Sequence, residues 1–217
     1  MNNKLVYPFD SLEILRKYKS FKKDLINKND LVDVKIFVAS GTTTDELIKI
    51  LEVFLLNIGI NPIILQGDYG LFYEDLAFQN NNLNDFKPDI IYIHTSFKNL
   101  KYAPLISDTA KSVEQKLKLE FNHYQEIWDH VNQNYGCTVI QNNFELPPNR
   151  PLGNLENALP NGVINYINKL NLKFSEHANS NENFLINDIN YLSSWHGIEK
   201  WFSLSEWYRS KHSVSLK

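Results

Sequence analysis

Apolar residues follow two patterns that alternate along the chain. The first is a short run with a nearly all-apolar centre, and it occurs at residues 32–40, 60–67, 87–96, 137–144 and 183–192. Such runs are typical of strands that are buried on both faces of a parallel sheet. The second is a longer stretch with apolar residues on one helical face, and it occurs at residues 44–58, 110–135, 162–178 and 197–212. A further short helix or turn is predicted at residues 70–78.

Five strands that alternate with helices predict a three-layer α/β/α fold with a five-stranded parallel sheet. We expect the flavodoxin-like strand order 2-1-3-4-5. Residues 11–28 have near-helical apolar spacing with Lys and Arg on the remaining positions, which predicts an amphipathic N-terminal helix. The chain of 217 residues therefore divides into a helical extension (1–30) and one α/β domain (31–217). In such folds ligands bind beyond the carboxyl ends of the strands.

Composition narrows the class of protein. A hydrophobic content of 43% fits a packed core, and a net charge of -3 gives no reason to expect nucleic acid or a membrane surface as a partner. The single cysteine, Cys137, suits a reducing cytoplasm, and no apolar stretch resembles a signal peptide or a transmembrane helix. No metal motif is present, because His123 and His130 lie seven residues apart on one predicted helix. We expect a cytoplasmic protein without a metal or cofactor.

The first strand ends in Ser40 and Gly41, and three threonines follow. Thr43 and Glu46 have the spacing of a capping box, in which the threonine side chain caps the helix and the glutamate bonds back. That explains Thr43 structurally. Thr42 has no such explanation, because its hydroxyl would project above the sheet from the turn.

Polar residues also follow the other strands. His94 ends the third apolar run and is the histidine best placed for a pocket, although a hydrogen-bonded structural histidine is equally compatible with its position. Arg150 lies in a proline-stiffened loop after the fourth run, which is either a functional loop or a rigid crossover. The full set of predicted ligand-binding residues is Ser40, Gly41, Gly67, His94, Thr95, Ser96, Asn142, Asn143 and Arg150.

The fifth strand leads to an acidic and a basic residue, Asp188 and His196, eight positions apart. A hydroxyl nucleophile needs a base within hydrogen-bond reach and an acid group that orients it. Asp188 and His196 supply an acidic and a basic group near one strand end.

Four segments together carry a family resemblance: ASGTTTDEL, FKPDIIYIHTSFKNL, QNNFELPPNRPLGN and NFLINDINYLSSWHG. They resemble the N-terminal domain of FkbH-like proteins, over roughly residues 30–212. That domain is similar to SGNH (GDSL-type) hydrolases, and in the family a HAD phosphatase domain with a DxDxT-type motif follows it. This chain contains no DxDxT motif. The resemblance implies an SGNH-like fold for residues 31–217 and a HAD domain elsewhere as partner.

The resemblance also places the SGNH catalytic blocks on this sequence. Thr42 falls at the nucleophile position of those hydrolases, and Tyr191 falls where their base histidine belongs. Asp188 falls at the position of their aspartate, and His196 or His94 would have to replace the base. The resemblance therefore implies Thr42, Asp188 and His196 as the candidate catalytic residues. The oxyanion asparagine is missing as well, unless Asn99 or Asn142 takes its role.

We hypothesise from the resemblance that the domain binds an acyl, glyceryl or carrier-linked ligand at the strand ends. It would thereby support a HAD-type catalytic domain in secondary-metabolite or surface-polysaccharide biosynthesis, with an acyl carrier protein as a possible partner. Two alternatives stay open. One is an active hydrolase or O-acyltransferase that uses Thr42 as nucleophile, and the other is a non-catalytic docking module.

Overall fold

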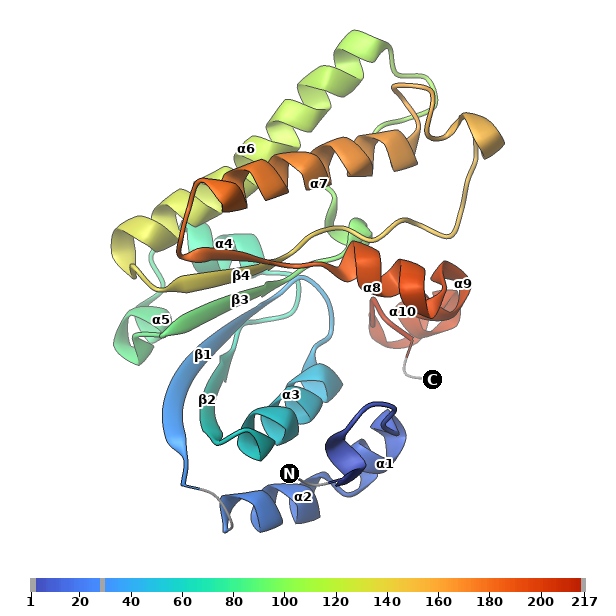
Figure 1. Cartoon of the computed structure of the whole chain (residues 1–217). Helices are drawn as coiled ribbons and strands as arrows, with labels where there is room; N and C mark the ends of the chain where they lie inside the picture. The colour runs from blue at the N-terminus through green and yellow to red at the C-terminus, as the bar shows by residue number, and fades with distance from the viewer. Residues whose placement is uncertain (1–2, 28–29, 216–217) are drawn as a thin grey trace.

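The computed structural model describes residues 3–27 and 30–215, and it contains the predicted sheet (Figure 1). The strands are β1 (Val32–Ser40), β2 (Ile60–Gln66), β3 (Ile90–His94), β4 (Thr138–Asn142) and β5 (Phe184–Asn187). They lie in the order β2-β1-β3-β4-β5, and every neighbouring pair is parallel. The predicted α/β/α class and strand order are confirmed.

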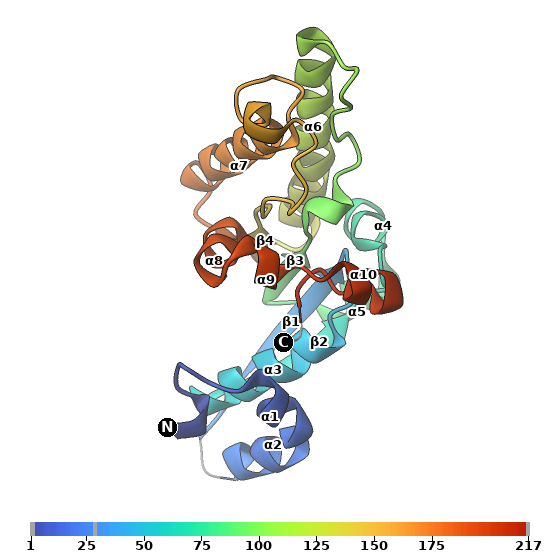
Figure 2. The same ribbon diagram turned by 90° about the vertical axis from the view of Figure 1, so that its right-hand side faces the viewer.

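Helices cover both faces of the sheet (Figures 1 and 2). On one side lie α4 (Phe72–Ala77), α6 (Ala110–Asn134) and α7 (Val163–Asn179). On the other side lies α3 (Asp45–Asn57), with α1 (Ser11–Arg16) and α2 (Tyr18–Ile26) packed against it. The remaining helices are α5 (Asn81–Phe86), which precedes β3, and α8 (Ile189–His196), α9 (Ile198–Trp201) and α10 (Leu204–Ser210). These last three gather at the carboxyl ends of the strands.

The structure corrects three predicted elements. The strand expected over 183–192 ends at Asn187, because the Asp188 side chain accepts a hydrogen bond from the Tyr191 amide and caps α8 instead. The helix expected over 197–212 is two short helices, α9 and α10. The helix expected over 11–28 is interrupted at Lys17, and residue 28 lies outside the described residues.

The main core lies between the sheet and the layer of α4, α6 and α7. Its centre is aromatic. The Phe174 ring of α7 is fully buried, and its centroid lies 4.9 Å from that of Trp128, 5.2 Å from Tyr124 and 5.5 Å from Phe144. Burial of such rings stabilises the fold through area removed from water and through edge-to-face contacts.

A second, smaller core joins the N-terminal helices to α3. Ile14 of α1 and Phe21 of α2 are buried there with Val53 and Leu56 of α3. This core fixes the position of α1 relative to the sheet, so that the N-terminal extension can contribute side chains to the strand ends.

Phe174→Ala is expected to lower the free energy of unfolding by about 3–5 kcal/mol, because it leaves a cavity at the centre of the aromatic core. Leu172→Ala is the control on the same helix; Leu172 is 60% exposed, so a change of about 0.5 kcal/mol or less is expected. Urea denaturation followed by circular dichroism measures both. Equal losses in the two variants would contradict the assignment of this core.

Candidate functional site

Polar residues meet at the carboxyl ends of the central strands. Ser40 at the end of β1 is in register with His94 at the end of β3, and Asn142 of β4 is in register with Asn187 of β5. The first three of these are buried, because α8–α10 and residues 211–215, here called the C-terminal segment, lie over the strand ends. The predicted location of the site therefore contains a buried polar cluster.

The turn after β1 is held by its neighbours. The Gly41 amide donates to the His94 carbonyl at 2.9 Å, and the Asn99 side-chain amide donates to the Gly41 carbonyl at 2.7 Å. A Cβ at position 41 would lie 2.8 Å from Asn99 Oδ1, so any larger residue would displace the Asn99 side chain. Asn99 Oδ1 in turn accepts the Ser96 amide at 3.0 Å. Asn99 thus fixes this turn, and the donors of its side-chain amide point to the Gly41 carbonyl.

The capping box predicted for Thr43 and Glu46 is wrong. The N-cap of α3 is Thr44, without a side-chain capping bond. Thr43 Oγ1 instead donates to the Ser210 carbonyl at 2.6 Å, and its amide donates to the Lys211 carbonyl at 3.1 Å. The C-terminal part of the chain supplies acceptors that local sequence spacing does not reveal, and these outcompete the local cap.

Thr42 is fully buried, and its hydroxyl faces another hydroxyl. Its Oγ1 lies 3.1 Å from Ser213 Oγ, which in turn lies 3.5 Å from His94 Nε2. Of the two candidate bases, the structure therefore connects His94 to Thr42, through Ser213. Whether His94 can act as a base toward these two hydroxyls depends on which of its ring nitrogens carries a proton.

The other nitrogen of His94 faces a network of amides and a phenol. Nδ1 lies 3.0 Å from Tyr92 Oη and 3.1 Å from Asn142 Nδ2. Asn142 is fixed in its orientation, because Nδ2 also donates to the Thr95 carbonyl at 3.1 Å while Oδ1 accepts from Asn187 Nδ2 at 2.8 Å. An amide nitrogen can only donate, so Nδ1 of His94 accepts from Asn142. The single proton of the Tyr92 hydroxyl can also point to Nδ1, because Asn187 already donates to Asn142 Oδ1.

The proton of neutral His94 is therefore on Nε2, pointing toward Ser213. Burial lowers the pKa of His94 from 6.5 to about 4, so the ring is neutral at physiological pH. A neutral ring protonated on Nε2 donates a hydrogen bond to Ser213 and cannot take a proton from it. In this arrangement Thr42 has no general base.

The other two candidate catalytic residues have different roles in the structure. Asp188 accepts the Tyr191 amide at 3.0 Å and the Asn143 side-chain amide at 2.7 Å, so it caps α8 and ties that helix to β4. His196 lies exposed in the last turn of α8, with its ring 6.4 Å from that of Trp201. Neither forms a hydrogen bond with Thr42 in the described part of the chain.

Several predicted ligand-binding residues have internal partners. Ser40 Oγ lies 2.9 Å from Thr44 Oγ1, and Thr95 Oγ1 accepts from Gln141 at 3.0 Å. Ser96 caps the short 3-10 helix that follows β3. The hydroxyls of Ser40, Thr95 and Ser96 are thus engaged with neighbouring groups of the protein.

Two further predicted residues lie away from the polar cluster. A Cβ at Gly67 would overlap the Asp75 carboxylate, so this glycine permits close packing of α4. Arg150 is exposed, and its guanidinium donates to the Gly153 carbonyl at 2.9 Å within its own loop. The structure thus brings Thr42, His94 and Asn142 together and leaves Arg150 outside.

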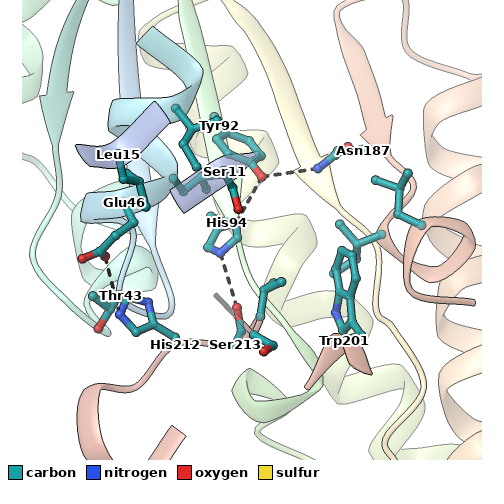
Figure 3. A pocket seen from close by; sticks show the side chains of 16 residues that line it. Ser11, Leu15, Thr43, Glu46, Tyr92, His94, Asn187, Trp201, His212 and Ser213 are labelled. Atoms are coloured by element: carbon teal, nitrogen blue, oxygen red, sulfur yellow. Dashed lines mark hydrogen bonds and ion pairs between the residues drawn. The ribbon is translucent and has the colours of Figure 1, made fainter. Parts of the chain in front are cut away.

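A cavity of about 270 Å³ opens beside His94 (Figure 3). Its walls are mostly apolar and come from Leu15, Leu47, Ile50, Ile189, Leu192, Trp201 and Val214. Its polar lining consists of Ser11, Thr43, Glu46, Tyr92, His94, Asn187, His212, Ser213 and Ser215. No lysine or arginine is among these described lining residues, and the Glu46 carboxylate lies 3.5 Å from His212 Nε2. Such a cavity suits a neutral ligand with an apolar body.

Sequence reasoning missed several residues of this cavity. Tyr92 was detectable, because it lies two positions before His94 and so shares its face of the strand. Asn187 required the strand register. Ser213 and Leu15 had no local signal, since they reach the site only through the packing of the two ends of the chain.

A family model described as FkbH, N-terminal domain, matches residues 35–217. The chain belongs to this family. The membership inferred from the four sequence segments is confirmed. No curated protein matches the chain.

Two solved structures match the chain to different degrees. The first is the N-terminal part of the protein BF1531 from Bacteroides fragilis, containing a phosphatase domain complexed with Mg, with a TM-score of 0.78 and 16% identity. The match covers 93% of this FkbH N-terminal domain and 52% of that chain, so the domain spans about half its length. The second is a lipase/acylhydrolase from Enterococcus faecalis, with a TM-score of 0.44, 15% identity and coverage of 84% and 88%.

Residues 3–27 and 30–215 of the FkbH domain lack two features. No helix there is long and apolar enough to cross a bilayer. No three His, Cys, Asp or Glu side chains are grouped so that they could hold a metal ion. The candidate site of the described chain therefore consists of hydroxyls, amides, one carboxylate and two histidines.

A second buried ionisable group of the FkbH domain lies just beyond β4. Glu145 is 1% exposed; its Oε2 accepts the Phe97 amide at 3.3 Å, and its Oε1 has no hydrogen-bond partner in the described residues. Burial raises the pKa of Glu145 from 4.5 to about 8, although backbone amides act in the opposite direction. The carboxyl is therefore protonated at neutral pH.

The free energy of unfolding is expected to fall by about 1–2 kcal/mol between pH 6.5 and 8, because unfolded Glu145 is ionised there while the folded group keeps its proton up to about pH 8. His94 does not contribute in this window: its lowered pKa makes stability rise with pH only between about 4 and 6.5. Glu145→Gln should remove most of this decline, as measured by urea denaturation at several pH values. The exposed Glu182→Gln is the control. An unchanged slope in Glu145→Gln would contradict a protonated Glu145.

Proposed function

We propose that this FkbH N-terminal domain binds a neutral acyl or glyceryl group at the carboxyl ends of its strands. The group would be either a free small molecule or attached to a carrier. The observation that carries the proposal is the cavity beside His94, which has apolar walls and a floor of neutral hydrogen-bonding groups. Small-molecule sites are typically concave, mostly apolar and oriented by a few polar groups. Binding, and not hydrolysis, is proposed because Thr42 has no base.

The electrostatics of the cavity favour an uncharged ligand. A phosphate or carboxylate inside it would lose hydration without gaining a cation, since the described lining contains no lysine or arginine. The Glu46 side chain would in addition repel such an anion. A carbonyl or hydroxyl, by contrast, can accept the proton that His94 presents on Nε2.

The role of the bound group is proposed from the family. The BF1531 structure contains a phosphatase domain, and the present domain spans about half of that chain. We propose that the FkbH N-terminal domain acts beside a HAD-type phosphatase domain and presents its ligand to it or to an acyl carrier protein. The pathway proposed is secondary-metabolite or surface-polysaccharide biosynthesis.

The test is isothermal titration with hexanoyl-N-acetylcysteamine, a neutral thioester with an apolar chain, against hexanoate as its charged counterpart. The wild type should bind the thioester and bind hexanoate at least tenfold more weakly. Leu192→Trp should weaken thioester binding at least tenfold, because position 192 is in the cavity wall and is 38% exposed, so that a larger ring is accommodated without unfolding. Leu159→Trp, at a position outside the cavity with 36% exposure, is the control.

Two results would contradict the proposal. One is equal thioester binding by Leu192→Trp and the wild type. The other is steady hydrolysis of p-nitrophenyl acetate by the wild type that Thr42→Ala abolishes, since that would identify Thr42 as an activated nucleophile.

A further inference from the structure

The C-terminal segment crosses the candidate site as an extended strap. It enters through Lys211, whose backbone has a φ of 59° and ends α10 in the left-handed region. Its backbone is tied at both ends: the Thr43 amide donates to the Lys211 carbonyl at 3.1 Å, and the Ser215 amide donates to the Trp201 carbonyl at 2.7 Å. The strap therefore connects the turn after β1 with α9.

Ser213, at the centre of this strap, places a hydroxyl in the polar floor of the cavity. It is 3% exposed, and its Oγ lies 3.1 Å from Thr42 Oγ1. The same Oγ lies 3.5 Å from His94 Nε2 (Figure 3). Because His94 donates from Nε2, Ser213 Oγ accepts there, and its own proton is available to Thr42. The Ser213 hydroxyl, a small neutral group with one oxygen, thus occupies the position between Thr42 and His94.

The strap contains little apolar side chain compared with the elements beneath it, although His212 and Ser213 are buried. Val214 is the only aliphatic residue among 211–215, so little apolar area is buried when the segment docks. The left-handed backbone of Lys211 costs about 1 kcal/mol or more for a residue with a side chain. The His212 contact with Glu46, at 3.5 Å, is long and has a partly exposed partner. Segments with few apolar contacts open most readily.

We propose that Ser213 is an internal occupant of the site, and that a ligand binds by displacing the strap and placing its own carbonyl or hydroxyl oxygen between Thr42 and His94. This inference rests on the proposed function, because it concerns the same cavity. The inference specifies which part of the ligand the site recognises: a single uncharged oxygen next to an apolar body. It also means that the C-terminal segment competes with that ligand for the site.

The direct test uses Ser213→Ala and the same thioester, hexanoyl-N-acetylcysteamine. Loss of the hydroxyl removes the competing hydrogen bonds, which are worth roughly 0.5–1.5 kcal/mol, so the variant should bind the probe about 3–10-fold more tightly than the wild type. Ser194→Ala is the matched control, since Ser194 is exposed on α8 and its hydroxyl donates to the Asn190 carbonyl within that helix. It should bind like the wild type.

Hydrogen exchange of the wild type gives a second readout that needs no variant. The amides of Thr43 and Ser215 are hydrogen-bonded only while the strap is docked, so they should exchange faster when the thioester is bound. The amides of β3 and α8 should exchange more slowly. Suppose that the probe binds, that exchange of these two amides is unchanged, and that Ser213→Ala binds no more tightly than the wild type. Ser213 is then a fixed part of the cavity wall, and this inference fails while the proposed function stands. If neither protein binds the probe, the proposed function fails with it.

Discussion

The amide of Asn142 determines the chemistry of this site. Its orientation is fixed by an acceptor, the Thr95 carbonyl, and by a donor, the Asn187 amide. It therefore presents an N–H to His94 Nδ1 and forces the ring proton onto Nε2. A Ser-His-Asp hydrolase needs the opposite arrangement, in which a carboxylate accepts from Nδ1–H and leaves the far nitrogen free to act as a base. Here the histidine is a hydrogen-bond donor.

The fold explains why such an arrangement is stable. Parallel strands end at one edge of the sheet, so polar residues at the ends of β3, β4 and β5 meet there, in register. The network is buried but well partnered, because Asn187 Nδ2 donates to both Tyr92 Oη and Asn142 Oδ1, so that the Tyr92 proton can point to His94 Nδ1. Both ends of the chain then complete the cavity: α1 supplies one wall, anchored by the smaller core, and the C-terminal segment supplies another.

The sequence predicts the sheet well, because the apolar runs of buried parallel strands are strong local signals that survive tertiary packing. It also predicts where the buried polar cluster lies, since His94 and Asn142 are at the ends of such runs. It fails where partners come from far along the chain. Thr43 has ideal spacing for a capping box with Glu46, yet it bonds to Ser210, some 167 residues away. Asp188 has the position of a catalytic acid, yet it caps a helix. A local sequence pattern shows which hydrogen bonds a side chain can form, but it does not show which partner the folded chain places beside it.

The protonation state of His94 can be measured directly by long-range ¹H–¹⁵N correlation NMR, with the signals of its ring assigned by comparison with His94→Gln. The account predicts a neutral ring with a proton on Nε2 and none on Nδ1 at neutral pH, and no titration until the pH approaches about 4. A proton on Nδ1 with a bare Nε2, or titration near pH 6.5, would contradict it and would restore His94 as a base for the hydroxyls beside it.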